Sequence, residues 1–308
     1  MVILAPHSFV GSIMLFNQPI TLRSVIRLSP IKVMFTWLMV LAENVFMILL
    51  PLFIGFAIDG VLKQNLQPLL MFAAILFVLV VISVARRFYD TRVYGGIRVR
   101  LSNLVERNLR GQSVSVKDAR LSMSRELVDF LEEDLPSLIT AVVQLVATVV
   151  ILATFHIKLA LCVLIAGLSM LLIYALFHQT FTRLNGALND QLEQQVRVLS
   201  GQPFAAIRTH FERLKRCEIK LSDTEALVYG LIFIVLFAAV LTNLWMVSIL
   251  TDPTVGQVFS IVTYSLEFVE TAVMLPITLQ TLSRLMEISQ RLNQNPAQLA
   301  VEEKPYEI

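Results

Sequence analysis

Three glutamates stand inside long apolar segments of the sequence, and their carboxylates are the groups best placed to do chemistry. Glu43 lies near the middle of a run from about 33 to 57, and Glu267 and Glu270 lie one helical turn apart in a run from about 255 to 279. A charge at membrane depth is costly, so such a residue usually faces a polar cavity or a partner. Two interpretations stay open. The carboxylates form an acidic patch for a cationic or polar substrate, or they are protonated and hydrogen-bonded to neighbouring helices.

Tyr264 and Gln144 are the other polar candidates for a pathway through the membrane, although hydrogen bonding between helices is the commoner use of residues such as Gln144 and Asn243. No Ser–His–Asp or Cys–His set and no pair of histidines at i, i+4 is identifiable, and no G-x-x-x-x-G-K-[ST] loop that could cradle phosphates occurs. We therefore expect a chain that is not an enzyme and has no cofactor or metal of its own.

The elements that carry these residues are predicted to be membrane-spanning helices. Of the 308 residues, 56% are hydrophobic and 16% are charged, whereas soluble domains carry about 25% charged residues. A spanning helix needs roughly 20 apolar residues. Six segments meet this requirement or nearly do, and they predict an all-α bundle of six transmembrane helices. The segments are 33–57, 68–85, 137–155, 159–177, 226–250 and 255–279.

Basic residues predict the orientation of these helices. Ten arginines and lysines lie between the second and third spans and seven between the fourth and fifth, whereas the opposite connections hold only Lys63 and Lys158. By the positive-inside rule, both termini and both long connections are cytoplasmic. Membrane orientation explains the basic residues fully, so we expect a lipid bilayer and no nucleic acid as partner. A bacterial inner membrane is the expected location.

The two long connections each continue a helical pattern beyond the membrane. Each has an apolar stripe at helical spacing, and each has a helix breaker near its middle, Gly111 in the first and Gly201 with Pro203 in the second. The stripes are Ile97, Leu101, Leu104, Val105 and Leu109, then Leu184, Leu188, Leu192, Val196 and Leu199. We predict two helical hairpins that reach roughly 30 Å from the bilayer, with a short helix at each tip. An amphipathic piece at 21–28, stopped near Pro30, is predicted to be an interfacial elbow helix.

Several local strings resemble one family. The first span ends in the string from Leu50 to Leu62, Ser124-Arg125 and then Asp129 precede the third span, Thr254-Val255-Gly256-Gln257 opens the last, and Ser283-Arg284-Leu285 follows it. In their order and spacing these strings are similar to the transmembrane domain of type I ABC exporters. The resemblance covers about 21–293. It suggests a tail at 1–19, a six-transmembrane domain at 20–293 and a second tail at 294–308.

The resemblance implies a permease subunit that stands alone, without a nucleotide-binding domain. Its pathway would form in a dimer with a second copy of itself or a related half-transporter. The hairpin tips would dock on a separate ATPase subunit that holds ATP and Mg. The implied docking residues are Gln112, Val114 and Val116 in the first tip and Pro203, Phe204 and Ile207 in the second.

Two other functions remain open at this stage. The chain could be a membrane scaffold or regulator without a motor. It could also be an ion-coupled carrier that uses Glu43, Glu267 and Glu270 as proton sites.

Overall fold

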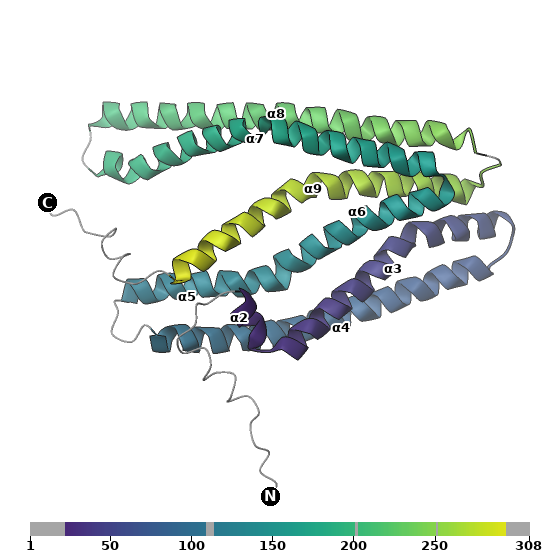
Figure 1. The fold of residues 1–308 in the computed structure, drawn as a ribbon, viewed down its shortest axis with the longest axis horizontal. Coiled ribbons are helices and arrows are strands. Elements are labelled where there is room, and N and C mark those ends of the chain that lie inside the picture. Colours follow the sequence, from purple (N-terminus) through teal and green to yellow (C-terminus); the bar gives the residue numbers. More distant parts are fainter. Residues whose placement is uncertain (1–21, 109–113, 201–202, 251, 294–308) are drawn as a thin grey trace, which may run out of the picture. The chain divides into compact units, whose positions relative to one another are not determined.

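The structure is a computed structural model, and it describes residues 22–108, 114–200, 203–250 and 252–293. Within these ranges the regular elements are all helices, which confirms the predicted all-α fold (Figure 1). The predicted tails at 1–19 and 294–308 lie outside the described residues.

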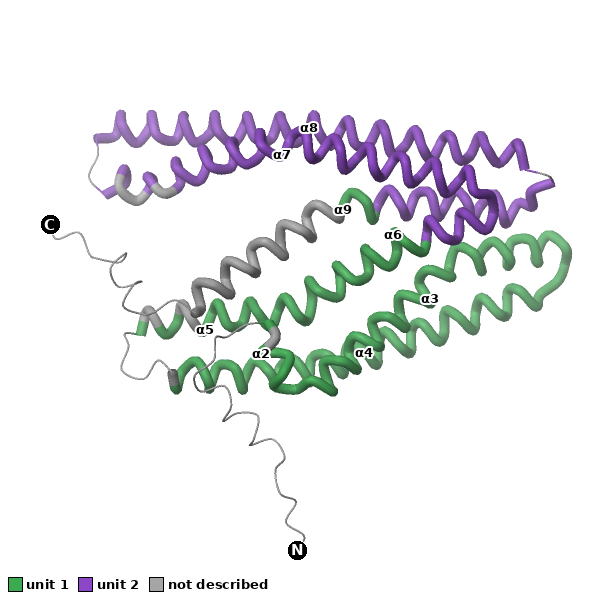
Figure 2. The backbone as a smooth tube through the Cα atoms, viewed as in Figure 1, with its two compact units in different colours: residues 1–147, 271–308 green, residues 148–270 purple. Residues whose placement is uncertain are grey.

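The chain divides into two compact units, 1–147 with 271–308 and 148–270 (Figure 2). Two helices, α6 (Leu135–Phe155) and α9 (Val255–Asn293), pass from one unit into the other.

The first unit begins with the predicted elbow. Helix α2 (Leu22–Arg27) is followed by a turn, and Pro30 then opens α3 (Pro30–Leu62), a position that suits proline because the first amide of a helix has no partner within it. Helix α4 (Gln67–Asn108) returns alongside α3. After it come α5 (Val114–Asp129), a π-helical turn η1 (Phe130–Asp134) and α6.

A tight turn at 63–66 joins α3 to α4. Gln64 has a φ of 57°, and the amide of Asn65 donates to the carbonyl oxygen of Gly60 over 2.8 Å. A Cβ atom at Gly60 would lie 2.8 Å from the carbonyl oxygen of Asn65 and 2.9 Å from Cγ of Pro68. Glycine at this position therefore lets the turn close against the end of α3.

The second unit is built on a long antiparallel pair, α7 (Ile157–Leu199) and α8 (Phe204–Val247). At 43 and 44 residues, each helix is about 65 Å long, more than the 40–45 Å of a whole bilayer. The helices therefore continue well beyond any membrane, as the hairpin prediction requires. Side-chain packing also joins α9 to this pair. Asn243 of α8 donates a hydrogen bond to Oγ of Ser265 over 3.0 Å.

The spanning helices expose apolar side chains along most of their length. Phe77 of α4 and Leu168 of α7 are exposed, as are most of their apolar neighbours. Within the described residues, five helical segments are long and apolar enough to cross a membrane, and they correspond to the first five predicted spans. The sixth predicted span lies in α9, whose side chains are described only as far as Met274. The protein is an integral membrane protein.

The predicted hairpins differ from the structure in two respects. The expected short helix at the second tip is wrong, because Phe204–Thr209 forms the first turns of α8; at the first tip, residues 109–113 lie outside the described residues. The two apolar stripes also differ in burial. Ile97, Leu101, Leu104 and Val105 are buried in the first hairpin, whereas in the second Leu184 and Leu188 are half-buried and Leu192 and Leu199 are exposed.

Candidate functional site

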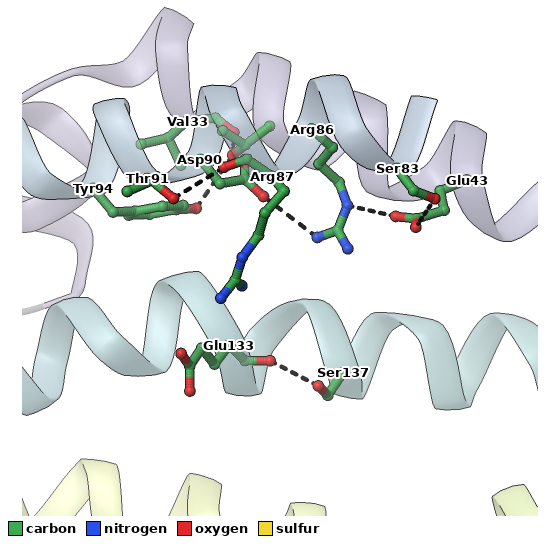
Figure 3. A network of polar contacts seen from close by, with 11 residues as sticks. Val33, Glu43, Ser83, Arg86, Arg87, Asp90, Thr91, Tyr94, Glu133 and Ser137 are labelled. Atoms are coloured by element: carbon green, nitrogen blue, oxygen red, sulfur yellow. Dashed lines mark hydrogen bonds and ion pairs between the residues drawn. The ribbon is translucent and has the colours of Figure 1, made fainter. Parts of the chain in front are cut away.

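A seam of polar side chains runs between α3 and α4 in the first unit (Figure 3). Ser83, Arg86, Asp90 and Tyr94 follow one another at spacings of three or four residues, so they share one face of α4. Arg86 forms an ion pair with Glu43 of α3 and a second one with Asp90, at 3.3 Å. Ser83 donates a 2.5 Å hydrogen bond to the Glu43 carboxylate. Three charged groups are thereby held together at a helix–helix contact.

Glu43 lies on the side of α3 that contacts α4. About 20 residues separate it from the turn at 63–66, which corresponds to roughly 30 Å along α3. Its partner Arg86 is the first charged residue after the apolar run of α4. Glu43 is therefore paired with a cation of the neighbouring helix. It differs in this from an isolated carboxylate at mid-membrane.

The seam continues with a second pair of side chains. The hydroxyls of Tyr94 and Thr36 lie 3.2 Å apart, and Thr36 donates to the carbonyl oxygen of Val33 over 2.7 Å. Tyr94 is 1% exposed and Asp90 is 4% exposed. Buried polar groups with partners fix one register between two helices, because any shift would leave them unpaired. The seam therefore holds α3 and α4 in one alignment.

A second polar cluster lies where the chain passes through the π-helical turn. Arg98 of α4 donates to Asp129 over 2.6 and 3.0 Å and to Glu132 over 2.6 Å. Asp129 directly precedes η1 and Glu132 lies within it, so one guanidinium bridges the start of this widened turn. An open groove of about 630 Å³ lies beside it. The groove is lined by Gly95, Arg98, Val99, Ser102, Asn103, Arg125 and Asp129.

The candidate pathway residues fall in both units. Glu43 and the half-buried Gln144 belong to the first unit, and Tyr264, Glu267 and Glu270 belong to the second. Tyr264 is buried, Glu267 is half-buried and Glu270 is exposed on α9. Their meeting in one pathway stays a prediction. Among the described residues, no group of His, Cys, Asp and Glu side chains could hold a metal ion.

The candidate docking residues lie at the helix ends that face the hairpin tips. Phe204 is 81% exposed in the first turn of α8, with Pro203 just before it and Ile207 half-buried one turn on. Val114, the first residue of α5, is 82% exposed. Gln112 lies outside the described residues, and the side chain of Val116 is not described. Large apolar side chains are thus presented at both hairpin ends.

A family model for the ABC transporter transmembrane region matches residues 22–256, well over half of the chain. The chain belongs to this family. No curated protein matches the sequence. The protein is thus an ABC transporter membrane domain, which agrees with the resemblance that the local strings indicated. The match begins at the first residue of α2 and includes both long hairpins.

Sequence reasoning missed several residues of this ABC transporter membrane domain. Arg86, Asp90 and Tyr94 form a run at spacing four directly after the apolar part of α4, and this pattern was the available signal for the seam. The double contact of Arg98 joins residues that are 31 and 34 positions apart. No local pattern signals a contact of that kind.

Proposed function

We propose that this membrane domain is the permease subunit of an ABC-type exporter, that it forms its pathway as a dimer, and that ATPase subunits on other chains drive it. In this proposal the connections at 109–113 and 200–203 face the cytoplasm. The ATPase binds ATP with Mg, and its movement switches the pathway between inward-open and outward-open states.

The observation that carries the proposal is the exposure of Phe204 at the end of the α7–α8 hairpin. An aromatic side chain that is 81% exposed beyond the membrane costs free energy in water, and large aromatic side chains are typical anchors of protein interfaces. The hairpin behind it is a pair of helices about 65 Å long. A force applied at Phe204 would therefore be transmitted along rigid helices to the membrane.

Two exposed leucines in the stripe of the second hairpin support the dimer. Leu192 and Leu199 are exposed on α7 beyond the membrane-spanning part, whereas the corresponding stripe of α4 is buried. Burying a leucine side chain is favourable by roughly 1.5–3 kcal/mol. A second chain that covers this stripe would gain that free energy.

The test is co-purification with an ATPase from the native cell. We expect the wild-type chain to retain an ATPase subunit in mild detergent and Phe204→Asp to lose it. Ile207→Asp should weaken the complex as well. The control is Ile219→Asp, which places the same charge on an exposed residue of the same helix, 15 residues further along α8. A folded wild-type chain that never binds an ATPase would overturn the proposal, as would equal retention by Phe204→Asp.

The two other functions predict different results in the same preparations. A scaffold without a motor would show no ATP hydrolysis that responds to transported compounds in any reconstituted complex. An ion-coupled carrier would take up its substrate in vesicles under a proton gradient without ATP, and Glu→Gln variants at 43, 267 and 270 would abolish that uptake. The ion pair of Glu43 with Arg86 argues against a freely exchanging proton at position 43.

A further inference from the structure

Basic side chains gather around the turn between α2 and α3. Arg100 of α4 donates hydrogen bonds to the carbonyl oxygen of Leu28 over 3.1 Å and to Oγ of Ser29 over 3.2 Å. Arg27 immediately precedes Leu28, and Lys32 lies three residues after Ser29. Basic residues of three different helices therefore lie at or next to one turn; we call Arg27, Lys32 and Arg100 the elbow cations.

The elbow cations are available to a ligand. All three side chains are exposed. Within the part of the chain that the structure describes, ion pairs engage Arg86, Arg98 and Arg208, and no carboxylate pairs with the elbow cations. Three positive charges without a counter-charge repel one another, so an anion bound among them would relieve that repulsion.

The turn is held firmly in place. Val25 of α2 is fully buried and packs with Tyr94, Ile97 and Leu101 of α4 and with Val128 of α5. Because α2 is packed against both neighbouring helices, the backbone positions that carry the elbow cations are fixed before any ligand arrives. A site that is ordered in advance loses less entropy on binding.

An apolar stripe on α3 begins at the same turn. Ile31, Met34, Phe35 and Leu38 are exposed on α3, on the side opposite the buried residues Val33, Thr36 and Val40. With 33 residues, α3 is about 50 Å long, and at an ordinary tilt it fills a bilayer including its headgroup layers. The Pro30 end then lies among the headgroups, and the stripe faces acyl chains.

We propose that the elbow cations bind the phosphate headgroup of an anionic phospholipid whose acyl chains lie along Ile31, Met34, Phe35 and Leu38. A zwitterionic headgroup carries its own cation beside the phosphate, so three unpaired positive charges favour a lipid with net negative charge. The apolar stripe distinguishes a lipid from a free phosphate. This site depends only on the membrane location of the protein and not on an ATPase partner.

The test uses the purified full chain in a neutral detergent, titrated with phosphatidylglycerol that carries a fluorescent acyl chain. We expect phosphatidylglycerol to bind at least tenfold more tightly than phosphatidylcholine with the same chains. Arg27→Gln and Lys32→Gln should each weaken the binding of phosphatidylglycerol about fivefold, since one basic residue near an anionic lipid is worth about 1 kcal/mol. The variants leave Arg100 intact because its loss would also release its hydrogen bonds to the turn.

The matched control is Lys215→Gln with Arg216→Gln on α8, which removes two exposed charges far along the sequence from the elbow. This control should bind phosphatidylglycerol like the wild type, while Arg27→Gln with Lys32→Gln binds about 25-fold more weakly. Equal affinity for both lipids, equal losses in both double variants, or full displacement by glycerol phosphate would overturn the proposal. So would Met34→Cys chains that form disulfide-linked dimers in the membrane, because a second copy would then cover the stripe. None of these results depends on whether an ATPase binds Phe204.

Discussion

Arg86 of α4 and Glu43 of α3 form an ion pair across the first helical hairpin, and Ser83 adds a hydrogen bond to the same carboxylate. The side chains of Arg86 and Glu43 are 26% and 18% exposed, so both groups are largely removed from solvent. Each charge at this depth is tolerated because the other neutralises it. The pair therefore stabilises one register of α3 against α4. The effect of substituting either residue on stability is predicted to depend on whether the other is present.

Removal of one member of this pair should cost more than removal of both. Glu43→Gln leaves Arg86 with Asp90 as its remaining partner, whereas Arg86→Gln leaves two acids without a cation. We expect Arg86→Gln to destabilise the fold by roughly 1–3 kcal/mol, less than the 3–5 kcal/mol of a fully buried pair. Thermal unfolding in detergent of the two single variants and the double variant measures the coupling. Additive losses would show that the pair does not hold the helices.

Arg98 contacts two acids of different exposure, so substitution of Arg98 and of Asp129 should lower stability by different amounts. Glu132 is nearly buried, with 8% of its side chain exposed, whereas Asp129 is half exposed. Arg98→Met should therefore lower stability by about 2–4 kcal/mol because it leaves Glu132 without its cation. Asp129→Asn should cost at most about 1 kcal/mol, since water can replace an exposed partner. The melting temperatures of Arg98→Met, of Asp129→Asn and of the double variant Arg98→Met with Glu132→Gln test this prediction. Equal losses of stability in Arg98→Met and Asp129→Asn would contradict it.

Alanine is expected to affect stability in opposite directions at two glycines, Gly60 beside the turn at 63–66 and Gly186 within α7. Gly60→Ala places a Cβ atom 2.8 Å from the carbonyl oxygen of Asn65, so the backbone must move, and we expect stability to fall by about 1–3 kcal/mol. Gly186→Ala on α7 meets no atom within 4 Å, so it should be neutral or stabilise by up to about 1 kcal/mol through helix propensity. Unfolding of the two variants under one set of conditions measures the contrast. A stabilising Gly60→Ala would show that the turn is looser than described.

The sequence predicted those features that a single helix determines. The apolar runs predicted the membrane-spanning helices, the short amphipathic piece before Pro30 predicted α2, and the stripe at Ile97 and Leu101 predicted a buried face. Contacts between helices were not predictable in this way. The partner of Glu43 depends on the register of α3 against α4, and that register results from packing at many positions together. The amino-acid sequence of residues 130–134 likewise contains no pattern that predicts the π-helical turn found there.

One contact between helices was suggested by residue type alone. Asn243 lies within an apolar run, and the interpretation as a helix–helix hydrogen bond is confirmed by its contact with Ser265. Asn243 is 0% exposed, and Ser265 in turn donates to the carbonyl oxygen of Ile261 over 2.8 Å. A polar side chain surrounded by apolar residues in a membrane must find a partner, so its presence indicates a contact even where it does not say with which helix.

This contact gives a prediction for the joint between α8 and α9. Asn243→Leu should lower stability by about 0.6–2 kcal/mol, the range of interhelical hydrogen bonds in membranes. Ser265→Ala should cost at least as much, because it leaves the buried amide of Asn243 without its acceptor. Thr242→Leu is the matched control, since Thr242 is exposed and donates only to Ala238 of its own helix. Thermal unfolding of the three variants in one detergent provides the comparison. If Asn243→Leu is as stable as Thr242→Leu, packing alone holds α8 against α9 and the hydrogen bond contributes nothing measurable.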